Sequence, residues 1–254
     1  MLPPRVLADR NRLASYVTMM MVPAAMFTMF FFLTLILQDP RIMNESPMDT
    51  GLKFLPFSIV MIVWAGAVVS RLVQRVNPGV LAGIGATVAA VATFGLSRMP
   101  YDDRTGRLAA DISYSTDILP YIILMPIGMG LVFIPMTMSV VHRVSPADSG
   151  IASGVLNTMQ QVGGALGLAT LATIALNATD AKAAEICRAV AAAGKQCDPA
   201  DPALGAVSFV HGATVGFLWC SGFLLFGAVI AFAFNRIRYQ DLASHEDIPV
   251  AGAH

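Results

Sequence analysis

Three carboxamide side chains stand close together in an uncharged stretch of this chain. Asn157, Gln160 and Gln161 lie in the segment GIASGVLNTMQQVGGALGLA, which contains no Asp, Glu, Lys or Arg. On a helix, Asn157 and Gln161 share one face and Gln160 lies just beside it. An amide carries both donors and an acceptor, so in an apolar environment it needs a partner. Two roles are open: hydrogen bonding between helices, or lining a cavity.

Glycines recur in the same segment at helical spacing. Small residues let helix backbones approach closely in lipid. Gly150, Gly154 and Gly164 share the face of the amides. Gly163 and Gly167 lie on a second face. A further pair, Gly128 and Gly130, precedes Pro135 and predicts a kinked, closely packed helix.

Two arginines and two cysteines are spaced for other chemistry. Arg71 and Arg75, in SRLVQRVNP, are four residues apart, so they share a helix face. They are either interfacial anchors or part of a gate. Cys187 and Cys197, in CRAVAAAGKQC, are either a disulfide that closes a small loop or two separate thiols. A metal site is not expected, because no third ligand lies nearby.

Catalytic signatures are missing from the sequence. It contains no HExxH, no phosphate-binding loop and no GxGxxG after a strand. The serines lack a plausible His or Asp partner within the apolar segments. We therefore expect neither an enzyme nor a bound cofactor.

The overall composition points to a membrane protein. Of 254 residues, 56% are hydrophobic and 13% are charged, against about 25% charged in soluble domains. Mean hydropathy is +0.67. The 16 basic residues balance the 16 acidic ones, so the basic excess of a nucleic-acid-binding protein is absent. The expected surroundings are a lipid bilayer.

Long uncharged runs place the helices that must hold these side chains. About 20 apolar residues cross a hydrocarbon core of about 30 Å, and backbone groups in lipid must pair internally. An all-α membrane protein follows, with two three-helix repeats joined by the polar link 98–117. The predicted helices are 13–37, 51–73, 78–97, 118–141, 150–175 and 206–234.

An even number of crossings puts both termini on one side. The two sides carry equal numbers of basic residues, but on the side of the termini these lie in short segments at helix ends, which favours the cytoplasm. A disulfide in the opposite loop would favour the same orientation, because disulfides persist outside the cytoplasm. We expect a cytoplasmic segment 1–12 and a disordered cytoplasmic tail 236–254.

Soft and aromatic side chains on the first two predicted helices suit a promiscuous apolar pocket. Met26, Met29 and Phe30 share a face at i, i+3 and i+4 spacing. Trp64 lies in the second predicted helix. Each of these residues either lines a cavity or packs against helices and lipid.

Four strings, in order, resemble one family. PRVLADRNRLASY, LQDPRIMNESPMDTGLKFLP, GMGLVFIPMT and SGVLNTMQQVGGALGLA resemble the C-terminal half of major facilitator superfamily drug:proton antiporters of the fourteen-helix branch. The resemblance covers residues 3–235. It implies export of lipophilic compounds across the plasma membrane in exchange for protons, with a proton gradient as the energy source and access alternating by rocking of two halves.

The chain also departs from that family pattern. The resemblance covers one half only, and none of the predicted spans contains Asp or Glu. Transport would therefore need an N-terminal half, on the same or a separate chain. The alternative is a truncated, non-transporting membrane scaffold, or a half-transporter subunit that needs a partner half.

Overall fold

Six long helices form the structure, a computed structural model that describes residues 10–104, 107–141 and 149–234. All six are long and apolar enough to cross a membrane, which confirms the predicted fold class. Two of them contain π-helical turns, η1 and η2. The helical elements are α2 (Arg10–Gln38), α3 (Pro47–Val63) continued by η1 (Trp64–Val69) and α4 (Ser70–Leu72), α5 (Pro78–Leu96), η2 (Tyr114–Ile118) leading into α6 (Leu119–Val141), α7 (Ser149–Ala192) and α8 (Pro202–Phe234).

Local sequence explains where the helices begin. Ser46 precedes α3, and its hydroxyl accepts a hydrogen bond from the Asp49 N–H at 3.1 Å. Asn77 caps α5 in the same way through the Gly79 N–H at 2.9 Å. A proline follows each cap, where its missing N–H costs nothing and its φ suits a first turn. The cap and the proline therefore fix the first residue of α3 and of α5.

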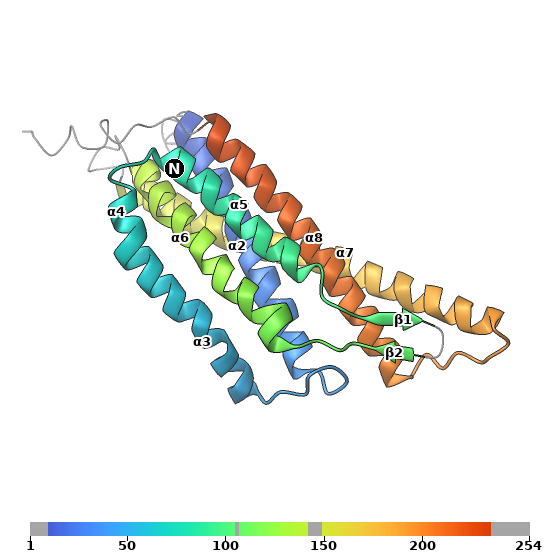
Figure 1. Cartoon of the computed structure of the whole chain (residues 1–254). Coiled ribbons are helices and arrows are strands. Elements are labelled where there is room, and N and C mark those ends of the chain that lie inside the picture. Colours follow the sequence, from blue (N-terminus) through green and yellow to red (C-terminus); the bar gives the residue numbers. More distant parts are fainter. Residues whose placement is uncertain (1–9, 105–106, 142–148, 235–254) are drawn as a thin grey trace, which may run out of the picture.

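The helices pack in two rows. α6 lies between α3 and α2, and α2 also packs along α7, so one row runs α3, α6, α2, α7. The second row is α5 and α8: α5 packs against α6 and α8, and α8 covers α2 and α7, which lie behind it in Figure 1. Close backbone contact joins the rows at Gly85 and Gly128, where a Cβ on either would lie 2.5 Å from the carbonyl oxygen of the other.

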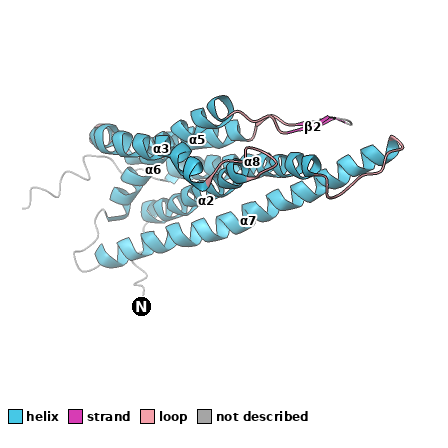
Figure 2. Ribbon diagram, turned by 90° about the horizontal axis from the view of Figure 1, so that it is seen from below, coloured by secondary structure: helices cyan, strands magenta, loops and turns pink. Residues whose placement is uncertain are grey.

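The helix α7 is much longer than the predicted crossing 150–175. Its 44 residues would extend about 66 Å at 1.5 Å per residue, more than twice a hydrocarbon core. Figure 2 shows its C-terminal part running past the other helices. We call residues 176–192 the α7 arm. Gly194, at φ 74°, stands just beyond it in the left-handed conformation that suits the end of a helix.

A two-stranded hairpin interrupts the polar link between the repeats. The strand β1 (Asp102–Arg104) pairs antiparallel with β2 (Arg107–Ala109), and Asp102 lies opposite Ala109. The hairpin projects at the same end of the bundle as the α7 arm (Figure 1), here called the hairpin end. The sequence predicted only a polar connection there. The expected tail 236–254 and residues 1–9 lie outside the described residues.

Candidate substrate-binding and partner-binding surfaces

The amides of α7 stand on its outward side. Asn157 and Gln161 are exposed and Gln160 is half-buried. Within the described part of the chain, none of the three makes a hydrogen bond to another residue. The neighbouring hydroxyl of Thr158 is satisfied by its own helix, donating to the Gly154 carbonyl at 2.9 Å. The amides are therefore the polar groups of this face that still need partners.

The glycines of α7 divide into two groups. Gly163 lies against the Met20 backbone, Gly164 against the Phe27 ring and Gly167 against Ala24, so all three bring α7 onto α2. Gly150 and Gly154, by contrast, have open space where a Cβ would stand. Gly164 was predicted to share the amide face, but it lies at the edge of that face, where α2 covers it.

The predicted cavity residues of α2 face two directions. Met29 is fully buried in the core, whereas Met26 and Phe30 are half-buried. The ring of Phe30 lies 4.9 Å from the rings of both Phe54 and Phe57, which joins α2 to α3. Phe30 therefore links α2 directly to α3.

Trp64 begins the π-helical turn of the second membrane helix. A Cβ on Gly130 of α6 would lie 3.2 Å from its Cδ1 atom, so Gly130 makes room for the indole. The indole Nε1 is buried and has no hydrogen-bond partner among the described residues. Pro135, also in α6, is buried, and its carbonyl oxygen accepts a hydrogen bond from the Ser139 hydroxyl at 2.8 Å.

Arg71 and Arg75 lie at the opposite end of the bundle from the hairpin. Both are exposed and, with Ala67 and Gln74, border a hollow of about 520 Å³. The Arg71 guanidinium donates to the Ala67 carbonyl of its own helix. This contact and the exposure suit an interfacial anchor and leave the gating role untested.

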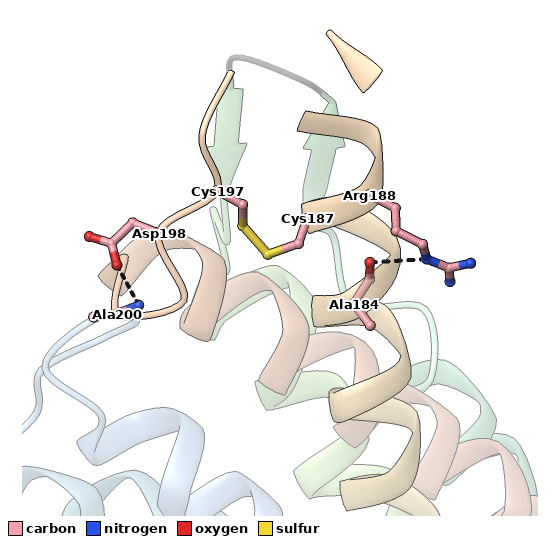
Figure 3. The surroundings of a disulfide bond; sticks show 6 residues. All are labelled: Ala184, Cys187, Arg188, Cys197, Asp198 and Ala200. Carbon is pink, nitrogen blue, oxygen red and sulfur yellow. Dashed lines mark hydrogen bonds between the residues drawn. A yellow bond between two sulfur atoms is a disulfide. The ribbon is translucent and has the colours of Figure 1, made fainter. Parts of the chain in front are cut away.

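A disulfide joins Cys187 in the α7 arm to Cys197 in the loop before α8 (Figure 3), with 5.2 Å between the two Cα atoms. The loop is shaped further on by the Asp198 carboxylate, which accepts from the Ala200 N–H at 2.9 Å. The arm is thereby linked covalently to the start of α8. Among the residues that the structure describes, no group of three His, Cys, Asp or Glu side chains is placed to hold a metal ion.

Polar contacts fasten the arm to the hairpin. Lys182 is 8% exposed, and its Nζ lies 2.6 Å from Asp103 Oδ2 and 3.2 Å from Glu185 Oε1. The hydrogen bond from Lys182 lowers the pKa of Asp103. Nearby, the Tyr101 hydroxyl lies 2.8 Å from Nδ1 of His211. Sequence reasoning did not find this cluster, although a lone lysine in an alanine-rich helix was a signal.

A family model matches the chain over residues 2–168, and its description is Major Facilitator Superfamily. The chain belongs to the major facilitator superfamily. The matched residues run from the start of the chain to the middle of α7, so they include the amides and both groups of glycines. The α7 arm and α8 lie beyond them.

Curated members of the superfamily resemble this chain along different lengths. A puromycin resistance protein of Streptomyces alboniger is 35% identical over 94% of this chain and 44% of its own length. A cephamycin export protein of Amycolatopsis lactamdurans is 34% identical over 67% of this chain and 33% of its own. A tetracenomycin C resistance and export protein of Streptomyces glaucescens is 29% identical over 62% and 27%. The chain thus spans less than half the length of these relatives.

Family and helices together establish a multi-pass membrane protein of a transporter superfamily. The relatives carry names of antibiotic resistance or export, and none of the three is named as an enzyme. The structure places the candidate cavity and helix-packing residues on α2, η1, α6 and α7, and it leaves Asn157 and Gln161 exposed.

Proposed function

We propose that this chain is the C-terminal six-helix half of a secondary-active multidrug efflux transporter, in which lipophilic compounds are exchanged for protons by alternating access. The observation that carries the proposal is the outward face of α7, which combines open glycines with unpaired amides. Membership of the superfamily and the names of the relatives support export as the activity.

Burial differs sharply among the membrane helices. In the most apolar window of α3, 11% of the residues are buried, and in that of α7, 22%, against 61% for α2 and α5. The exposed side chains of α3 are apolar, such as Ile59 and Ile62, which lipid or protein can cover. The exposed side chains of α7 include Asn157 and Gln161, whose hydrogen bonds lipid cannot supply.

A partner half with its own helices would provide packing and hydrogen-bond partners for the outward face of α7. Open glycines at Gly150 and Gly154 let a second helix approach, and the two amides would then pair across the contact or face water in a central cavity. The relatives are more than twice the length of this chain, which is room for such a half on the same polypeptide. A separate chain would serve equally.

Proton coupling would depend on that partner. None of the six predicted crossings contains Asp or Glu, so the acidic groups that bind protons would come from the N-terminal half. Lipophilic compounds would contact Met26, Phe30 and Trp64 from this half. We place the assembled transporter in the plasma membrane with both termini cytoplasmic, and we expect no cofactor.

The test joins this chain to the N-terminal half of the puromycin resistance relative, in vesicles loaded with a lipophilic fluorescent cation. We expect proton-driven efflux that falls at least about tenfold in the double variant Asn157→Ala, Gln161→Ala, because each lost amide contact removes about 1 kcal/mol. The matched control is Asn177→Ala, an exposed amide of the α7 arm.

Two results would contradict the proposal. Efflux that is unchanged in the double variant would remove the role of the amide face. When the two halves are expressed as separate chains, their failure to co-purify, with this chain folded, would instead favour a non-transporting membrane scaffold.

A further inference from the structure

A hollow of about 420 Å³ lies at the hairpin end, between the α7 arm, the start of α8 and the loop after α2. It stands eighteen residues beyond Gln161 along α7, about 27 Å at 1.5 Å per residue. This distance separates it from the amide face. The volume falls in the range of small-molecule sites, about 300–1,000 Å³.

The hollow is closed at its inner end by contact between two helices. Gly212 of α8 lies directly against the Thr179 side chain and the Ala175 carbonyl of α7. Beyond this contact the α7 arm still packs on α8 through Ile186, Leu204 and Val207, and the disulfide-linked Cys187 borders the hollow. The helix contact and the disulfide determine the size of the hollow without any partner half.

Two polar groups of the lining have bonding capacity left. Ser208 is 1% exposed, and its hydroxyl has no hydrogen-bond partner among the described residues. Arg41 uses Nε and Nη2 on the Asp39 carboxylate, at 2.9 and 2.6 Å, while its Nη1 lies against Gly205 in the wall. By contrast, the Thr179 hydroxyl is satisfied by the Ala175 carbonyl at 3.0 Å.

The charge of the lining selects the class of ligand. The paired carboxylate of Asp39 neutralises Arg41, and the same contact lowers the pKa of Asp39, so the pair stays ionised together. Arg41 is the charged residue of the lining and would repel a cation, while its ion pair with Asp39, which lies outside the lining, leaves no net charge to hold an anion. The remaining walls, including Leu204 and Phe209, are apolar. An uncharged aromatic molecule with an acceptor oxygen meets these conditions.

We propose that this hollow is a second binding site, which takes an uncharged aromatic compound whose carbonyl or hydroxyl oxygen bonds Arg41 Nη1 and the Ser208 hydroxyl. The aromatic body lies against Phe209 and Leu204. Binding here needs neither the partner half nor transport, so it goes beyond the proposed function.

The test uses the whole chain in lipid nanodiscs and 6-propionyl-2-dimethylaminonaphthalene, an uncharged naphthalene ketone, as the probe. The variant Ala184→Cys places a thiol in the lining, and its alkylation by a membrane-impermeant maleimide is timed without reductant. At about four times its Kd, the probe should slow alkylation about fivefold, because protection equals 1 + [L]/Kd. The control is Ala192→Cys, exposed at the end of the arm, where the rate should not change.

Two further variants assign the polar contacts. In the Ala184→Cys background, Arg41→Met and Ser208→Ala should each raise the apparent Kd of the probe about 3- to 10-fold, the effect of one hydrogen bond. The matched control is Ser221→Ala, a buried serine of the same helix outside the lining, which should leave the Kd unchanged.

Three outcomes would overturn the site. The first is no protection of the thiol in Ala184→Cys, and the second is equal slowing in Ala192→Cys, which reports partition of the probe into lipid. The third is an unchanged Kd in both Arg41→Met and Ser208→Ala. None of them bears on efflux, which is measured with the joined halves.

Discussion

Two faces of the same helix use glycine in opposite ways. On one face of α7, Gly163 and Gly167 bring the backbone against α2, and a side chain there would meet Met20 or Ala24. On the other face, Gly150 and Gly154 have nothing beside them. A pattern of small residues therefore marks a helix contact without showing whether the partner helix belongs to the same bundle.

The amides also differ in burial between the two faces. Gln160, beside the packed face, is half-buried, whereas Asn157 and Gln161 on the open face are exposed. In water such exposure would need no explanation, but hydrocarbon offers no hydrogen bonds. This combination of open glycines and unpaired amides supports the proposal that the face contacts a partner half.

The largest effect is expected on the packed face. Gly163→Leu would drive a side chain into the Met20 backbone, which cannot move without shifting α2. We expect a loss of about 3 kcal/mol in the free energy of unfolding, measured by denaturant titration in detergent micelles. Gly154→Leu is the matched control and should change stability by less than about 0.5 kcal/mol. Equal destabilisation by the two would remove the distinction between the faces.

The same control variant should act on association. Because Gly154→Leu fills the space that a partner helix needs, we expect its affinity for the N-terminal half to fall about tenfold, or about 1.4 kcal/mol. The measurement is co-purification of the two halves at graded concentrations. If Gly154→Leu binds the partner as tightly as the parent chain does, the open face is not the contact.

A smaller effect is expected in the α7 arm, which is attached to the hairpin by an ion pair and not by close glycine contacts. Lys182 is held by Asp103 of the hairpin, so Lys182→Met should loosen the arm by about 1 kcal/mol. Hydrogen exchange should quicken in residues 176–192 and stay unchanged in α2. Arg188→Met is the control, since Arg188 is exposed and bonds the Ala184 carbonyl of its own helix. Faster exchange throughout the bundle would show that the arm is not an independent attachment.

The smallest effect is the pH dependence of that attachment. Lys182 holds the pKa of Asp103 below its usual 3.8. A lowered pKa in the folded state adds stability above about pH 4, and this contribution is lost as the pH falls through the folded pKa. An NMR titration of the Asp103 carboxyl carbon should show a midpoint below 3.8 that rises in Lys182→Met. A midpoint that does not move in the variant would separate the shift from the ion pair.

Much of the fold could be predicted because lipid simplifies the problem. Each uncharged run had to be a helix, and the structure has six such helices. The length of α7 could not be predicted in this way, because hydropathy reports where the membrane ends and not where a helix ends. The alanines of the arm continue the helix outside it, up to Gly194. The hairpin was missed because it is short and its strands pair only with each other.

The candidate site was predicted less completely. Helical spacing grouped Asn157 with Gln161 and placed Gly163 with Gly167, as the structure does. Spacing did not show that Met29 turns into the core while Phe30 reaches Phe54 and Phe57. All three side chains of the predicted α2 group are apolar, so neither orientation was excluded by their chemistry.

By itself, the sequence determined that this protein crosses a membrane as helices and that three amides lie in one of them, because charge and hydrogen bonding are costly in hydrocarbon whatever the fold. Only the tertiary structure decided which neighbour each helix face receives. The position of α2 covered Gly163 and Gly167 and left Gly154 and Gln161 outside, because contacts between helices depend on side chains that are distant in the sequence.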